Sequence, residues 1–158
     1  QGWTLHLCGS VKEENSHHVA YLEAIKQKAG KALERQVYMY VNTPLEEVMV
    51  LAQRAMVFWH ATGYGEIIPE ACEHFGIATV EAMSAGCIPV VIDKGGQVEI
   101  VTAGAGYRWE TPQTMVEQTL AIEDMRSTER EAMAAVAMLR AGDFAEARFL
   151  ERLKDLEL

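Results

Sequence analysis

The chain has 158 residues, of which 49% are hydrophobic, and it carries a formal net charge of −9 at pH 7. This length and apolar content favour one domain with a proper core, and they exclude a low-complexity or fibrous protein. The acidic balance argues against nucleic acid as a partner, because the sequence shows no basic patch to offset it. An anionic ligand would have to be held mainly by backbone N–H groups at helix N-termini.

Short apolar runs between turn residues predict strands, and helical periodicity with capping residues predicts the helices between them. The predicted strands cover residues 4–8, 37–41, 56–59, 88–92 and 106–109. The predicted helices cover residues 16–33, 44–54, 75–85, 98–101, 112–124 and 127–140, and a last one reaches Leu156. The expected N-terminal caps are Ser16, Thr43, Thr111, Ser127 and Asp143.

This alternation predicts an α/β fold, with a parallel sheet and helices on both of its faces. In such sheets ligands bind beyond the carboxyl ends of the strands. The loops that follow the first four strands are therefore expected to share one edge, and both Glu73 and the Gly95-Gly96 turn fall on it. These four loops begin after Cys8, Val41, Trp59 and Ile92.

Two carboxylates, Glu73 and Glu81, lie eight positions apart around the start of a predicted helix. Gly76 lacks a Cβ, so a bulky ligand can approach the backbone there. The N–H groups of residues 74–77 are expected to be unpaired, and with the helix dipole they suit a diphosphate or a sugar oxygen. Glu73 can accept hydrogen bonds from sugar hydroxyls, and Glu81 can accept them from a ribose. The simpler alternative is that Glu73 caps the helix and that Glu81 is a solvated helix residue.

The run E-H-F-G-I-A-T-V-E-A-M-S-A-G-C-I-P-V-V-I from Glu73 to Ile92 resembles the E-x7-E signature of retaining GT-B glycosyltransferases, the group 1 or family 4 set. Residues 95–99 resemble the G-G-x-x-E turn of that family, and residues 143–153 resemble its closing helix. The resemblance implies a Rossmann-like parallel sheet with helices on both faces, which is one half of a GT-B fold. Residues 1–158 would then form the C-terminal, donor-binding domain of a longer protein, whose missing N-terminal domain binds the acceptor.

The resemblance also assigns roles to residues of this chain. Glu73 would be the catalytic residue at the donor sugar, and Glu81 would hold the ribose. Gly9 and Ser10 would lie by the diphosphate. The remaining donor-binding positions are Tyr40, Val41 and Asn42 at the base, the backbone of His74, Phe75, Gly76 and Ile77 at the sugar and diphosphate, and the turn at Gly95 and Gly96. The implied mechanism is transfer with retention, by attack on the front face of an oxocarbenium-like sugar.

The implied donor is a UDP- or GDP-sugar, and no cofactor or metal is required. The sequence His74-Phe-Gly-Ile, which is also found in mannosyltransferases that act on lipid-linked sugars, favours GDP-mannose. The location would be cytoplasmic, with the missing domain associating with the inner face of a membrane. Two departures matter: the Arg and Lys that grip the diphosphate in the family lie upstream of this chain, and the loop over residues 60–72 is longer than usual. That loop either shapes the sugar pocket or is a passive insertion.

Other interpretations of the same residues stay open. A sugar-nucleotide epimerase of GT-B architecture would use the same ligand, and a non-catalytic domain could keep the fold and the binding site. A nicotinamide-binding domain is disfavoured, because Cys8-Gly9-Ser10-Val11-Lys12 lacks the G-x-G-x-x-G fingerprint. His6 is expected to be a core residue with satisfied hydrogen bonds. Lys94 is expected either to touch phosphate or to be solvated.

Overall fold

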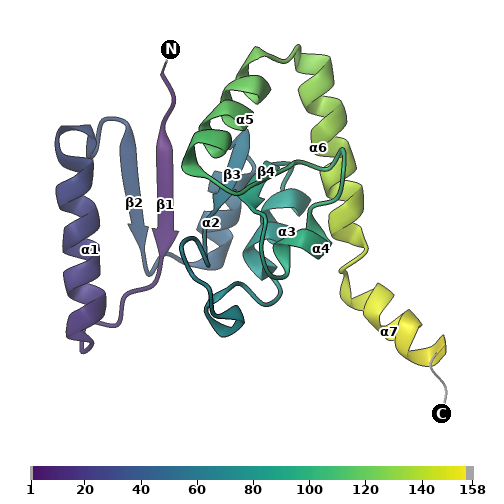
Figure 1. Cartoon of the computed structure of the whole chain (residues 1–158), viewed down its shortest axis with the longest axis horizontal. Helices are drawn as coiled ribbons and strands as arrows, with labels where there is room; N and C mark the ends of the chain where they lie inside the picture. Colours follow the sequence, from purple (N-terminus) through teal and green to yellow (C-terminus); the bar gives the residue numbers. More distant parts are fainter. Residues whose placement is uncertain (1, 156–158) are drawn as a thin grey trace. The chain divides into compact units, whose positions relative to one another are not determined.

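The computed structural model describes residues 2–155. Its strands are β1 (Leu5–Gly9), β2 (Val37–Val41), β3 (Val57–His60), β4 (Ile88–Ile92) and β5 (Tyr107–Trp109) (Figure 1). Its helices are α1 (Ser16–Ala29), α2 (Leu45–Ala52), α3 (Ile77–Ser84), α4 (Gln97–Ile100), α5 (Pro112–Asp124), α6 (Ser127–Gly142) and α7 (Glu146–Asp155), with short 3₁₀ turns η1 (Gly30–Ala32) and η2 (Pro69–Ala71). The predicted end of the last helix, Leu156, lies outside the described residues.

The strands form two parallel sheets, and the chain divides into two compact units between Leu51 and Ala52. In the first unit β1 pairs with β2, and in the second the order is β3-β4-β5. The expected sheet is thus divided into two: the loops after β1 and β2 share an edge of the first sheet, and those after β3 and β4 share an edge of the second. A central strand of a doubly covered sheet is buried on both faces, whereas β1 exposes His6 and Cys8.

The core of the second unit is built on the two faces of β4, all five residues of which are buried. Ile88, Val90 and Ile92 pack with Trp109 of β5 and Ile122 of α5. The alternate residue, Val91, packs on the other face in a cluster with apolar residues of α3, α4 and α6. Helices therefore cover both faces of this sheet, as predicted from the alternating pattern.

Local capping moves several helix ends from their predicted positions. Asn15, not Ser16, caps α1, because its side chain accepts hydrogen bonds from the amides of His17 and His18. The helix stops at Ala29 rather than at residue 33, because Gly30 adopts a positive φ of 49°. The N-cap is the residue whose short polar side chain accepts hydrogen bonds from the free amides of the first helical turn.

The capping residues of the C-terminal helices also differ from the prediction. Ser127 is the first residue of α6, and the amide of Arg126 before it donates to Glu129 Oε2 at 3.0 Å. Asp143 was predicted to open the last helix, but it ends α6 and its carboxylate accepts a hydrogen bond from Arg140 at 2.8 Å. Within residues 2–155, no helix has both the length and the apolar content to span a membrane.

Candidate functional site

Glu73 is bound by its own loop at the start of α3. Its Oε1 accepts hydrogen bonds from the amides of Phe75 and Gly76 at 3.3 and 3.1 Å. The expectation of four unpaired amides at residues 74–77 is therefore wrong for these two. Gly76 has a φ of 98°, which is accessible to glycine, and α3 begins directly after it. These two amides precede α3, which begins at Ile77 without a side-chain cap, so Glu73 binds the loop before the helix and does not cap its first turn.

The second carboxylate oxygen of Glu73 faces a histidine that the sequence did not single out. His60, the last residue of β3, places its Nε2 3.4 Å from Glu73 Oε2. On the other side of the ring, Nδ1 lies 3.3 Å from Nε2 of Gln97, the first residue of α4. The side chain of His60 is 11% exposed and that of Glu73 is 31% exposed, so the pair is partly screened from water.

The Gly95-Gly96 turn packs directly on the Glu73 loop, as predicted. The amide of Gly96 donates to the carbonyl oxygen of Glu73 at 2.8 Å. A Cβ on Gly96 would lie 2.5 Å from the carbonyl oxygens of His74 and Phe75, and one on Gly95 would collide with the Glu73 carbonyl. Two glycines are needed here because the backbones of the two loops touch.

Glu81 and the apolar residues of α3 complete this part of the site. Glu81 is half-buried in the second turn of α3. Ile77, at the first position of the helix, is 64% exposed. Phe75 is 46% exposed and meets Phe144 edge to face, with the ring centroids 5.6 Å apart. The predicted residues from Glu73 to Glu81 thus lie around one helix start, next to the glycine turn.

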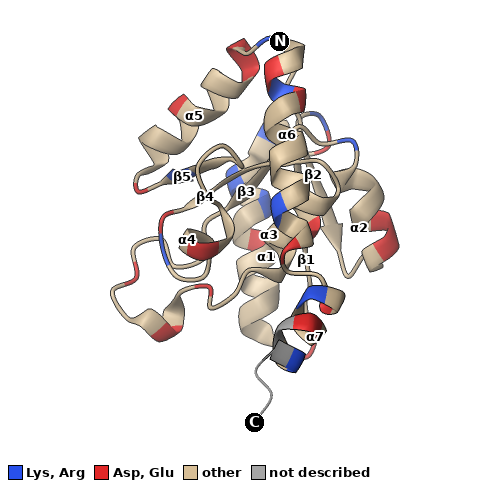
Figure 2. Ribbon diagram, turned by 90° about the vertical axis from the view of Figure 1, so that its right-hand side faces the viewer, with Lys and Arg blue, Asp and Glu red and all other residues tan. Residues whose placement is uncertain are grey.

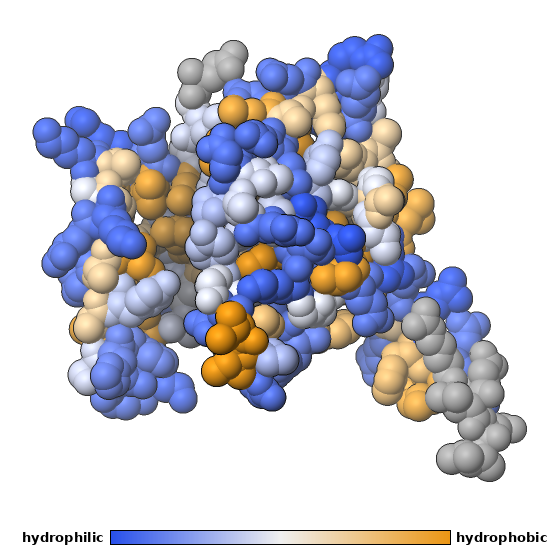
Figure 3. All heavy atoms as spheres, in the orientation of Figure 1, coloured by the Kyte–Doolittle hydropathy of each residue, from blue (hydrophilic) through white to orange (hydrophobic). Residues whose placement is uncertain are grey.

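Lys94 anchors the long loop between β3 and α3 through two hydrogen bonds. Its Nζ donates to the carbonyl oxygens of Gly63 at 3.3 Å and Glu66 at 2.7 Å. The expectation that Lys94 is solvated differs from these observed bonds. The loop is therefore anchored to the end of β4. It also exposes Ile67 by 94%, in the region near η2 where Figure 3 shows hydrophobic surface among hydrophilic residues.

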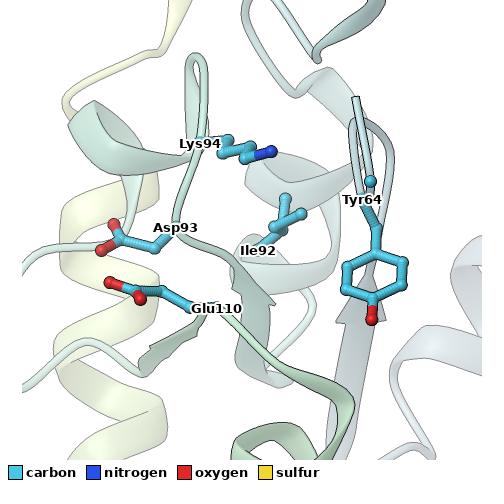
Figure 4. Close-up of a pocket in the computed structure, with 6 residues that line it drawn as sticks. Tyr64, Ile92, Asp93, Lys94 and Glu110 are labelled. Carbon is cyan, nitrogen blue, oxygen red and sulfur yellow. The ribbon is translucent and has the colours of Figure 1, made fainter. Parts of the chain in front are cut away.

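A hollow of about 470 Å³ lies beside this loop, at the carboxyl ends of β4 and β5. In Figure 4 the carboxylates of Asp93 and Glu110 lie on one side of it and Tyr64 on the other. A smaller hollow of about 260 Å³ shares Lys94 and includes Gly95. The loop therefore shapes open space next to the glycine turn, although Glu73 lines neither hollow.

Acidic residues surround these loops, and the nearby arginines are already engaged. Figure 2 shows acidic residues on α4 and along α5. Arg108 pairs with Asp93 at 3.2 Å, and Arg140 binds Asp143 and the Glu99 carbonyl oxygen. An anionic ligand at the start of α3 would therefore depend on backbone N–H groups. Within residues 2–155 no cluster of three or more His, Cys, Asp or Glu side chains could hold a metal ion.

The predicted residues of the first unit form a separate group at the ends of β1 and β2. Asn42, at a φ of 56°, joins the two loops: its amide N–H donates to the Gly9 carbonyl, and its side chain exchanges two 2.9 Å hydrogen bonds with the backbone of Val11. Gly9 pairs in register with Val41, and Ser10 follows in the same exposed loop. The side chain of Asn42 is thus already satisfied by the loop that it joins.

The observed position of His6 differs from the predicted one. This residue is exposed and not in a core. Its Nδ1 lies 3.1 Å from the hydroxyl of Tyr40, and its ring stacks on Tyr38 and Tyr40 at centroid distances of 5.2 and 5.6 Å. The exposed, alternating face of a two-stranded sheet brings these three side chains together.

His60 and Gln97 are the site residues that sequence reasoning missed. The available signal was position: His60 follows the third strand at the ligand edge, and Gln97 follows the glycine turn at the same edge. The 3.3 and 3.4 Å contacts that join them to Glu73 depend on loop conformation, which the spacing of residues does not reveal.

Parallel strands, covering helices and a glycine-rich site at the strand ends define this chain as an α/β protein of the Rossmann-like class. The family model of the glycosyl transferases group 1 matches residues 1–137, and the chain belongs to that family. This finding confirms the resemblance drawn from the E-x7-E run.

Two further comparisons agree with the family. The sequence is 29% identical over 156 residues to the GDP-Man:Man(3)GlcNAc(2)-PP-Dol alpha-1,2-mannosyltransferase of Caenorhabditis elegans. The match covers 94% of this chain and 31% of the relative, so the chain spans about a third of the relative's length. The fold is similar to that of Anabaena HepE, solved in complex with UDP, with a TM-score of 0.60, 23% identity, and coverage of 97% of this chain and 41% of that chain.

Proposed function

We propose that this chain is the donor-binding half of a two-domain retaining glycosyltransferase that transfers a hexosyl group from a nucleotide diphosphate sugar. The observation that carries the proposal is the arrangement at the start of α3. There the Glu73 carboxylate is held in place beside the Gly95-Gly96 turn, at the carboxyl edge of the β3-β4-β5 sheet. Family membership supports the same reaction class. The acceptor would be bound by the N-terminal domain that the resemblance implies.

In this proposal each part of the site has one task. Glu73 accepts hydrogen bonds from hydroxyls of the donor sugar, and Glu81 accepts them from the ribose. The backbone N–H groups at the N-terminus of α3 and in the glycine turn that are not bonded to Glu73 would face the diphosphate, since the nearby cations are engaged elsewhere. Gly9, Ser10, Tyr40, Val41 and Asn42 would contribute to the diphosphate and base contacts from the first unit.

We further propose GDP-mannose as the donor and a lipid-linked sugar as the acceptor. The His-Phe-Gly-Ile sequence from His74 to Ile77 supports this choice, and so does the similarity to an enzyme whose name specifies GDP-Man and a PP-Dol acceptor. The similar HepE structure contains UDP, so UDP-sugars are the competing donors. A cytoplasmic enzyme at the inner face of a membrane would meet both substrates.

The first test is donor binding by titration calorimetry on the full-length protein, with GDP-mannose, UDP-glucose and an ADP-sugar. We expect heat with GDP-mannose and weaker or no heat with the others. The absence of heat with all three would contradict the proposal and would favour a non-catalytic domain. For residues 1–158 alone we expect no transfer, since acceptor groups are lacking in the proposed arrangement.

The paired variants Glu73→Ala and Glu81→Ala test the division of labour between the two carboxylates. We expect Glu81→Ala to weaken GDP binding about tenfold, the effect of losing one or two hydrogen bonds to a charged group. Glu73→Ala should abolish transfer while changing GDP affinity less. Affinity for GDP by calorimetry and transfer by product analysis are the two measurements.

Glu131→Ala is the matched control for these variants, because this exposed glutamate lies on α6, away from the α3 start. Equal donor affinity in wild type and in both site variants, at unchanged melting temperatures, would contradict the roles proposed for Glu73 and Glu81. Release of GDP that requires an acceptor would separate a transferase from an epimerase of the same architecture.

A further inference from the structure

His60 links two elements of the site through both of its ring nitrogens. Its Nε2 faces Glu73 Oε2 at 3.4 Å, and its Nδ1 faces Nε2 of the Gln97 side chain at 3.3 Å. Gln97 is completely buried, and its Oε1 has no hydrogen-bond partner among residues 2–155. The amide of Gln97 thus contacts the ring through its nitrogen.

The chemistry of the amide determines which ring nitrogen carries the proton. The side-chain nitrogen of Gln97 can only donate, so Nδ1 of His60 must accept and the ring proton of the neutral form must sit on Nε2. That proton points at the Glu73 carboxylate. Burial lowers the pKa of His60 more than the neighbouring Glu73 raises it, which favours the neutral ring at neutral pH.

Both oxygens of Glu73 are then held by donors from different segments. The loop amides of Phe75 and Gly76 hold Oε1, and the ring of His60 holds Oε2. Both oxygens of the carboxylate are therefore held in place. A charged group that contacts a substrate in one orientation has to be held in this way.

Gly76 allows the glutamine to reach the ring. A Cβ at Gly76 would lie 2.7 Å from the Gln97 side-chain nitrogen, too close for a carbon atom beside a buried amide. Any larger residue at this position would displace the amide from His60. The third residue after Glu73 is thus needed for the Gln97–His60 contact as well as for the turn.

We propose that His60 is a positioning residue for Glu73: Gln97 holds the ring with its proton on Nε2, and the ring holds the carboxylate in the orientation that the donor sugar meets. The inference rests on the proposed function, in which Glu73 contacts that sugar. His60 itself needs no contact with the substrate in this arrangement.

The first experiment observes the ring directly and requires no ligand. Side-chain ¹⁵N NMR of the wild-type protein at neutral pH should show Nε2 of His60 protonated and Nδ1 bare. In Gln97→Met, which keeps the bulk of the buried side chain and removes the donor, the share of rings protonated on Nδ1 should rise, although Glu73 still favours a proton on Nε2. His17→Asn, at an exposed position of α1, serves as the control for assignment and folding. A wild-type ring with its proton on Nδ1 would overturn the inference.

The second experiment compares two replacements of His60 in the full-length protein. The side-chain nitrogen of His60→Gln can still donate to Glu73, whereas His60→Leu has no donor. We expect His60→Leu to bind GDP normally but to bind GDP-mannose about tenfold more weakly, and His60→Gln to recover most of that loss. The difference between the two ligands isolates the sugar contact, which a general loss of stability would not change selectively.

The outcomes separate the inference from the proposed function. If wild type binds neither GDP-mannose nor UDP-glucose, the proposed function fails, while the NMR result still decides the tautomer. If wild type binds GDP-mannose and His60→Leu binds it equally well, the positioning role of His60 is rejected and the proposed function stands. If His60→Leu does not fold, the same comparison is made between wild type, Gln97→Met and His60→Gln. Equal GDP-mannose binding in all three then counts against the inference.

Discussion

His60 is subject to two opposing effects on its charge. Burial of the ring disfavours the imidazolium, while the carboxylate of Glu73 favours it. Burial is the larger effect, so the pKa of His60 is lowered from its ordinary value. A group whose pKa is depressed by folding binds fewer protons in the native state than in the unfolded state over the intervening pH range.

This depression predicts how stability depends on pH. The free energy of unfolding should be unaffected by His60 above the unfolded pKa of about 6.5, and it should fall as the pH drops below that value. In His60→Gln that part of the pH dependence should disappear. Urea unfolding at a series of pH values measures it. Parallel curves for wild type and His60→Gln would contradict the prediction.

Sequence reasoning found most of the candidate site residues but not their contacts. Glu73 and Gly95-Gly96 could be placed at one edge because strand order alone brings their loops together. The bonds from Glu73 to the amides of Phe75 and Gly76 could not be foreseen, since they depend on loop backbone angles that residue spacing does not reveal. The contact with His60 joins residues 13 positions apart across an irregular loop, for which no periodicity exists.

Among the elements, α5 is the one whose start and end both follow from local sequence. Thr111 caps it, with its Oγ1 accepting a hydrogen bond from the Thr114 amide at 3.2 Å, and Pro112 occupies the first helical turn. Ile122 of the same helix is buried against β4. The position of α5 thus depends on the capping hydrogen bond of Thr111 and on the packing of Ile122 against β4.

Removing the cap should cost a measurable part of the stability. We expect Thr111→Ala to lower the free energy of unfolding by about 1 kcal/mol, because the Thr114 amide loses its acceptor. Urea denaturation at constant pH is the measurement. Thr128→Ala, at an exposed position in the first turn of α6, should change the stability by much less. Equal losses in the two variants would show that the Thr111 bond has no special role.

Strand ends were predicted more reliably than helix ends. β2 and β4 begin and end as predicted, because each is a continuous apolar run between polar or glycine residues. Helices α1 and α6 begin at Ser16 and Ser127, as their predicted ranges do, but their N-caps are Asn15 and Arg126. Helix α1 ends at Ala29 and not at residue 33, and α6 ends at Gly142 and not at residue 140.

At the scale of the whole molecule, the two units differ in how many of their residues are buried. Among residues 2–51 none is buried, whereas the second unit encloses two clusters on the faces of β4. Local opening requires less free energy where few apolar groups are buried. The two units are therefore expected to differ in how easily their backbone hydrogen bonds open.

Hydrogen exchange followed by mass spectrometry or NMR tests this difference. We expect amides of β1 and β2 to exchange at least tenfold faster than those of β4, which opens only with the core. The comparison is internal, because the three strands belong to parallel sheets and have five residues each. Similar protection of β2 and β4 would indicate that residues 2–51 are stabilised by groups beyond their own unit.

The sequence by itself determined the α/β class, the family and the residues around Glu73, because periodicity, strand order and a long specific motif are local properties. Only the tertiary structure decided that the strands form two sheets, that Lys94 holds the long loop, and that His60 and Gln97 hold Glu73. These features depend on hydrogen bonds between residues distant in the chain, whose geometry is set by loop backbone angles and by burial.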